Sequence, residues 1–119
     1  LSPFAAAQMP ARRNNNDLIF TTNGKVATQL GSKIQTKLRE IAGIPHWQFR
    51  DFRRTFSTHM HEAAIDGMGD QHFVIEACLN HRDGTRRGVA GVYNRAQYRA
   101  QKQTVLQAWS DLVEAAIGH

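Results

Sequence analysis

The sequence predicts one mainly α-helical domain with a single short strand or hairpin. Apolar residues recur at helical spacing in most of the chain, and clusters of glycine, proline and other turn residues separate these periodic segments. Only residues 18–22, LIFTT, have the composition of a strand, and the NGK that follows is typical of a turn. The 119 residues suffice for one small domain with a core and are too few for two.

Two helices are predicted before Pro45. Ser2 can cap a short helix over residues 2–9, in which Pro3 is tolerated in the first turn. A longer helix is predicted from about residue 28 to residue 42, and Gly43 closes it. The apolar positions of this second helix are Leu30, Ile34, Leu38 and Ile41.

Three further helices are predicted after Pro45. The first opens at Asp51, which can cap its first turn, and the second is a short helix capped by Asp70. A turn-rich basic loop over residues 80–88 leads to the last helix, from about residue 94 to 117. The apolar stripes of the three helices are Phe52, Phe56, Met60, Ala63 and Ala64; Phe73, Val74, Ala77 and Cys78; and Val105, Trp109, Leu112, Val113 and Ala116.

Composition favours a polyanionic partner in a reducing compartment. Lys and Arg total 15 against 10 acidic residues, which gives a net charge of +5 and a pI near 10.0. Neutralising phosphates with such cations is the sequence-independent part of nucleic-acid affinity. The single cysteine, Cys78, excludes an intramolecular disulfide and is expected to be a small buried hydrophobe. No apolar run has the length of a membrane span, and nothing resembles a secretory signal.

Three arginines surround one phenylalanine in the segment RDFRRT. In the predicted helix Arg53 and Arg54 point about 100° apart, and Arg50 precedes them. The N-terminus of a helix carries partial positive charge, so cations near it are electrostatically unfavourable. A bound phosphate would relieve this repulsion, and a guanidinium can bind two of its oxygens at once. The alternative is a surface ion pair with Asp51 or Glu62.

Three sequence boxes that follow one another suggest a family. RDFRRTFSTHM resembles the box commonly written H-D-L-R-R-T in the tyrosine recombinases, the phage integrase family. VIEACLNH resembles the next box, which ends in L-x-H. GVAGVYNRAQY, with LQAWSDLV behind it, resembles the nucleophile segment of prophage and genomic-island integrases. The similarity spans roughly residues 18–113, and it implies the C-terminal part of the DNA breaking-rejoining catalytic fold, with the upstream part of that domain and the N-terminal DNA-binding domains absent.

The resemblance implies a chemistry and the residues that perform it. In this family a tyrosine hydroxyl attacks a DNA phosphodiester, which gives a 3′-phosphotyrosine link and a free 5′-hydroxyl without ATP, metal or cofactor. Tyr93 would be the nucleophile, Arg53 a clamp on the scissile phosphate, and His81 a hydrogen-bond donor to that phosphate as charge builds. Arg50 would complete the catalytic set. The arginines expected to contact the DNA backbone are Arg54, Arg82, Arg86, Arg87 and Arg95.

Other candidates have simpler interpretations. Tyr98 lies five residues after Tyr93, inside the predicted last helix, where an aromatic is more often a packing residue. His59 and His61 are two apart on a helix and so face different directions, which makes them a poor metal site. No Cys/His spacing in the chain is typical of zinc.

The chain departs from the family pattern in two places. The histidine of the first box falls at position 50, where Arg50 keeps the positive charge and the donors but is a poor proton acceptor. His46, beyond Pro45, is not expected to substitute. The family's first catalytic arginine and its hairpin lysine lie upstream of the matched stretch, and Lys25 falls on the wrong side of that landmark.

The leading interpretation is therefore part of a bacterial, cytoplasmic and nucleoid-associated integrase that assembles on double-stranded attachment sites as a multimer, expected to be a tetramer. The isolated chain is expected to bind DNA weakly and to have little recombinase activity. The alternatives are a non-catalytic DNA-binding prophage remnant, a relative of type IB topoisomerases that nicks and closes strands, and a helical interaction domain with no DNA role.

Overall fold

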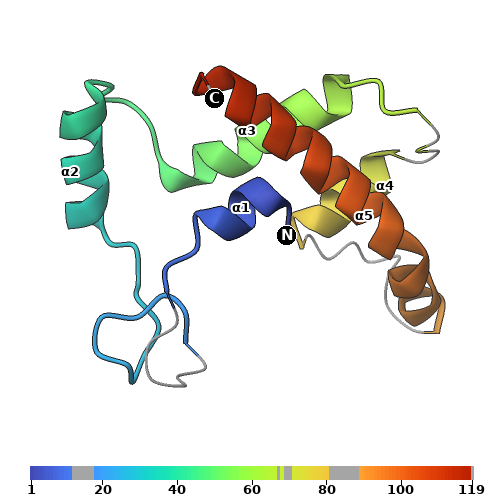
Figure 1. The fold of residues 1–119 in the computed structure, drawn as a ribbon, viewed down its shortest axis with the longest axis horizontal. Coiled ribbons are helices and arrows are strands. Elements are labelled where there is room, and N and C mark those ends of the chain that lie inside the picture. Colours follow the sequence, from blue (N-terminus) through green and yellow to red (C-terminus); the bar gives the residue numbers. More distant parts are fainter. Residues whose placement is uncertain (12–17, 67, 69–70, 81–88, 119) are drawn as a thin grey trace.

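In the computed structural model of the chain, the longest helix lies across three others, and one helix stands apart (Figure 1). The structure describes residues 1–11, 18–66, 68, 71–80 and 89–118, and the side chains of residues 89–97 lie outside this description. The described helices are α1 (Pro3–Ala7), α2 (Ser32–Ala42), α3 (Phe49–Glu62), α4 (Gln71–Cys78) and α5 (Val89–Ala116). The prediction of a mainly α-helical fold is confirmed.

Helix α1 is capped and docked by one side chain. The Ser2 hydroxyl accepts a hydrogen bond from the Ala5 backbone N–H at 3.1 Å, as the sequence predicted for the cap. The same hydroxyl donates to the Ser110 hydroxyl of α5 at 2.8 Å, and both serines are buried. The cap of α1 therefore also fixes where this helix lies on α5.

Helices α3 and α4 meet at a corner closed by Gln71. The chain leaves the helical conformation at Ala63, and Gln71 on α4 donates from Nε2 to the Ala63 carbonyl at 2.7 Å and also to the Met60 carbonyl. The last carbonyls of a helix have no partner within it, so a side chain from the next helix supplies the missing donor. This contact joins α3 to α4 at the end where the chain turns.

The core lies where α3, α4 and α5 cross. The fully buried side chains Met60, Val74, Ile75 and Val105 come from all three helices. The other buried apolar residues are Phe56, Met68 and Leu79, and the partly buried ones packed on them are Ala63, Ile65, Cys78, Tyr98, Ala108 and Trp109.

Several predicted core positions are wrong. Phe52 is 61% exposed, because the first turn of α3 extends beyond the core, and its ring lies 5.4 Å from that of Trp47. Ala64 is exposed because α3 has already ended. Leu112 and Ala116 are exposed on α5, because they follow the part of this helix that carries its buried described residues, Val105 and Ser110.

The predicted strand at residues 18–22 is also wrong. Among the described residues there is no strand. One backbone hydrogen bond, from the Thr28 N–H to the Phe20 carbonyl at 2.7 Å, closes a loop in place of a ladder. Within this loop the Asn23 side chain accepts hydrogen bonds from the backbone N–H groups of Lys25 and Val26, as in an Asx turn. Hydrogen bonds to a side chain therefore hold this turn without pairing between two strands.

Helix α2 begins later than predicted and packs little. Thr28 belongs to the loop just described, so the helix starts at Ser32, and Gly43 ends it with a φ of 67° that suits glycine. None of the residues of α2 is buried, and Ile41 is 74% exposed. Arg39 holds the helix to the start of α3 by donating from Nε to the Trp47 carbonyl at 2.7 Å.

The overall dimensions reflect this separation. The radius of gyration is 16.9 Å, against roughly 13.5 Å for a compact domain of this length. The accessible surface is 9666 Å², against roughly 6,500 Å² for a compact monomer of this mass. The described helices thus form one small packed body, α1 with α3, α4 and α5, and α2 stands apart from it (Figure 1). The apolar side chains of α2, among them Ile34, Leu38 and Ile41, are exposed.

In the part of the chain that the structure describes, no helix combines the length and the apolar character needed to cross a bilayer.

The core predicts a clear contrast between two isoleucines on helices. Ile75→Ala should lower the free energy of unfolding by about 2–5 kcal/mol, because it removes buried methylene groups and leaves a cavity. Ile41→Ala should change it by less than about 0.5 kcal/mol, since this side chain is already 74% exposed. Urea unfolding followed by circular dichroism measures both; Ile75→Val, with an expected loss of about 0.5–1.5 kcal/mol, serves if Ile75→Ala does not fold. Equal losses for the two alanine variants would contradict the assigned core.

Cys78 predicts a loss of stability in alkali. The thiol packs against the core, and burial raises its pKa above the ordinary value of 9.0, with Lys102 acting in the opposite direction. A raised pKa in the folded state means that the neutral thiol favours folding below pH 9, and that this contribution disappears as the pH rises through the folded pKa. The difference in unfolding free energy between the natural chain and Cys78→Ala should therefore shrink from pH 8 to pH 10.5. A constant difference would show that the thiol titrates normally.

Candidate functional site

The candidate site begins at the first turn of α3. Gln48 is the N-cap residue, and its backbone N–H donates to Asp51 Oδ2 at 2.8 Å, while the Gln48 side chain accepts from the Asp51 backbone. This is a reciprocal capping box. The helix thus starts two residues before the predicted opening at Asp51, and the carboxylate stabilises the turn from the third helical position.

Arg54 takes the ordinary role that the sequence left open. Its Nη1 lies 3.6 Å from Asp51 Oδ1, and both side chains are well exposed to solvent. An exposed pair of this kind contributes little to stability. Among the described residues, the alternative of a surface ion pair is confirmed for Arg54, which pairs with Asp51.

Arg53 points in another direction and connects two helices. Its Nη2 donates a hydrogen bond to the Leu79 carbonyl at the end of α4. Asn80 follows with a φ of 56°, a left-handed conformation that asparagine tolerates better than most residues. The guanidinium therefore lies beside the point where the chain leaves α4, two residues before His81 in sequence.

The three arginines of the RDFRRT segment share one open hollow of about 560 Å³. Arg50, Arg53 and Arg54 line it together with two hydroxyl side chains and one apolar residue. These last three are Ser57, Thr58 and Leu79. Guanidinium and hydroxyl donors around one hollow suit an anion with several oxygen atoms.

A second hollow, of about 480 Å³, adjoins the first. Arg50 and Arg54 line both, and Arg39 and His46 extend the basic lining toward α2. Arg39 was not among the residues predicted from the sequence. Its place in the last turn of the predicted helix before Pro45 was a usable signal, since a basic residue there can bond nearby carbonyls, as Arg39 does with that of Trp47.

The remaining predicted site residues are not tested. His81, Arg82, Arg86 and Arg87 lie outside the described residues. The backbones of Tyr93 and Arg95 belong to α5, which begins at Val89 rather than near residue 94, while their side chains lie outside the description. Position 93 therefore lies inside the helix, whereas the sequence predicted a helix that starts just after it.

Four other side chains have packing or hydrogen-bonding roles. Tyr98 packs against the core, as expected of the competing tyrosine. The Thr55 hydroxyl donates to the Asp51 carbonyl one turn back in the same helix at 2.7 Å. His59 and His61 diverge as expected: His59 lies against Trp109 with ring centroids 6.2 Å apart, and His61 faces α4.

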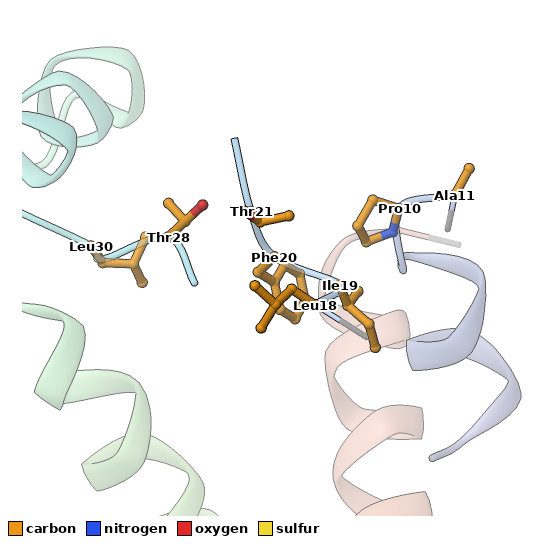
Figure 2. Close-up of a pocket in the computed structure, with 8 residues that line it drawn as sticks. All are labelled: Pro10, Ala11, Leu18, Ile19, Phe20, Thr21, Thr28 and Leu30. Carbon is orange, nitrogen blue, oxygen red and sulfur yellow. The ribbon is translucent and has the colours of Figure 1, made fainter. Parts of the chain in front are cut away.

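An apolar hollow of about 540 Å³ lies away from the arginines, in the segment before α2. Figure 2 shows Leu18, Ile19 and Phe20 gathered between Pro10 on one side and Leu30 on the other. Among the described residues that line it, the polar side chains are the two threonines, and none is charged. These described residues lack the cationic groups expected of a phosphate site.

The cap can be separated from the ion pair by mutation. Asp51→Ala should lower the free energy of unfolding by about 0.5–2 kcal/mol, because the Gln48 N–H loses its acceptor at the start of α3. Arg54→Ala removes the same ion pair but leaves the cap, and should cost less than about 0.5 kcal/mol. Chemical denaturation of both variants measures the two losses. A larger loss for Arg54→Ala would mean that the pair, and not the cap, stabilises the turn.

Comparison of the chain with known protein families, with curated proteins and with solved structures returned no match. The functional assignment therefore depends on the sequence boxes and on the geometry of the arginines.

Proposed function

We propose that the chain is the C-terminal part of a tyrosine recombinase catalytic domain, which breaks and rejoins DNA through a covalent phosphotyrosine. The observation that supports this most is the position of Arg53. Its guanidinium lines a hollow with Arg50 and Arg54 and hydrogen-bonds the carbonyl of Leu79, next to the segment that the resemblance assigns to His81.

The proposed reaction requires that the DNA phosphate is held in place and that its negative charge is stabilised. A DNA phosphodiester carries one negative charge, and a second develops as the tyrosine oxygen bonds to phosphorus. Guanidinium groups arranged before the reaction stabilise that charge without reorganising. The exposed side chains of Arg50 and Arg53 are accessible to a DNA backbone, and the adjoining hollow with Arg39 and His46 extends the basic surface.

In the proposed mechanism Tyr93 supplies the nucleophile. Its hydroxyl loses its proton as the oxygen forms a bond to phosphorus, the bond to the 5′-oxygen breaks, and that oxygen takes up a proton and leaves as a hydroxyl. In the reverse direction a 5′-hydroxyl of another strand attacks the phosphotyrosine and releases Tyr93. Both steps conserve the number of phosphoester bonds, so no ATP is required.

The upstream acid and the first arginine of the family are proposed to come from segments outside this chain. The exposed apolar face of α2 and the large accessible surface are consistent with further protein covering this body. Multimer formation on DNA, with four copies at paired sites, belongs to the same proposal.

Trapping tests the proposal. The full-length protein incubated with a nicked suicide substrate should give a covalent protein–DNA adduct, because the cleaved strand diffuses away before rejoining. Tyr93→Phe should abolish the adduct, while Tyr98→Phe should retain it, since Tyr98 packs on the core. Arg53→Lys keeps the positive charge but loses the bidentate contact with the phosphate, and should slow adduct formation roughly a hundredfold.

Other outcomes identify the alternatives. DNA binding that falls steeply with salt, but without an adduct, would favour a non-catalytic remnant, to which the replacement of the family's histidine by Arg50 gives some support. Relaxation of supercoiled DNA without paired sites would favour a topoisomerase-like activity. Binding that is insensitive to salt would exclude a phosphate-contacting function altogether.

A further inference from the structure

Two histidines and a glutamate from different helices meet on the surface away from the arginine hollow. His61 comes from the last turn of α3, and His72 and Glu76 lie four residues apart on α4. Their ligand atoms all lie within 4.8 Å of one another, and His61 Nε2 is 2.9 Å from His72 Nδ1. Residues four apart on a helix share a face, so the α4 pair presents a nitrogen and a carboxylate to the same point.

The tautomer of His61 is set by the backbone. Its Nδ1 lies 2.7 Å from the Ser57 carbonyl oxygen, which can only accept a hydrogen bond. Nδ1 therefore bears the hydrogen, and in the neutral ring Nε2 keeps its lone pair and faces His72. Metal-binding histidines usually donate their other ring N–H to a carbonyl or carboxylate in this way, which orients the ring and raises its basicity.

We propose that His61, His72 and Glu76 form a binding site for a divalent transition-metal ion of the zinc class. Imidazole nitrogen and carboxylate oxygen are ordinary zinc ligands, and three protein ligands leave a fourth position for water. Two nitrogens bound to one zinc at about 2.05 Å in a tetrahedron stand roughly 3.3 Å apart. The observed 2.9 Å between the two nitrogens has to open by a few tenths of an ångström. The other separations, at most 4.8 Å, have to close by up to about 1.5 Å, which a rotation of the Glu76 side chain can provide.

Helix α4, which carries two of the three ligands, is fixed in place by its other contacts. Gln71, next to His72, hydrogen-bonds the carbonyl of Ala63 at 2.7 Å, and the adjacent α4 residues Val74 and Ile75 are fully buried. Ligands on such packed helices lose little freedom when a metal binds. A bound ion would join α3 to α4 near the corner that the hydrogen bonds of Gln71 also close.

The competing explanation is a simple hydrogen bond between two imidazoles, in which His72 Nδ1–H donates to His61 Nε2. This pair needs no metal and gives the same 2.9 Å separation. The two explanations differ in what Glu76 does: a metal site requires its carboxylate, whereas the imidazole pair does not.

Zinc titration of the 119-residue chain distinguishes them. At a zinc concentration about ten times the dissociation constant, the melting temperature should rise by roughly 5 °C or more, because the ion binds the folded chain. Competition with a chromophoric chelator should give one ion per chain. His72→Gln and Glu76→Gln should each weaken binding at least about tenfold and lose most of the temperature rise.

The matched control is His59→Gln. This histidine lies on α3 two residues from His61, is exposed, and faces Trp109 instead of α4. Its removal should leave both the zinc affinity and the zinc-dependent rise unchanged, whatever it does to the melting temperature without zinc. The proposal would be overturned by the absence of a zinc-dependent rise in the natural chain, or by a rise that His72→Gln and Glu76→Gln leave intact. Neither result bears on the covalent-adduct experiment.

Discussion

The joint between α3 and α4 is the constraint on which the rest of the described structure depends. Gln71 closes one end of it by bonding the last carbonyls of α3, and Arg53 closes the other by bonding the carbonyl of Leu79. Between these two contacts Met60 and Ile75 fill the interface with fully buried side chains. Because both ends are fixed by side chains that reach the partner helix's backbone, the joint sets where the arginines lie and where the chain leaves α4.

The sequence predicted helices well where periodicity and a stop signal agreed. Gly43 ended α2 as expected, and Ser2 capped α1. It failed where composition was the only guide: residues 18–22 are rich in strand formers, but the hydroxyl of Thr21 and the side chain of Asn23 bond the loop internally, so no ladder forms. Propensity describes the residue, whereas a strand needs a partner that this segment does not have among the described residues.

Burial was harder to predict than helicity, and the reason is tertiary. Phe52 and Phe56 are one turn apart on the same stripe, but only Phe56 meets another helix, at Trp109 with ring centroids 5.5 Å apart. Helical spacing predicts which residues lie on the same face of a helix. It does not predict how far along that face the neighbouring helices extend. For the same reason the sequence did not predict that His61 lies close to His72 and Glu76. These residues come from two helices, and their spacing along the chain is not typical of zinc ligands.

The arginine cluster illustrates how local electrostatics can indicate a ligand. Three guanidinium groups lie near a helix N-terminus, where they add to the partial positive charge of that end. The first turn contains one carboxylate, that of Asp51. That carboxylate is already shared between the Gln48 N–H and Arg54. Arg53 is directed toward a carbonyl, which neutralises none of its charge. The cationic excess at this end of α3 is thus only partly offset within its first turn, and an anion with several oxygen atoms, such as a phosphodiester, is the kind of ligand that would balance it.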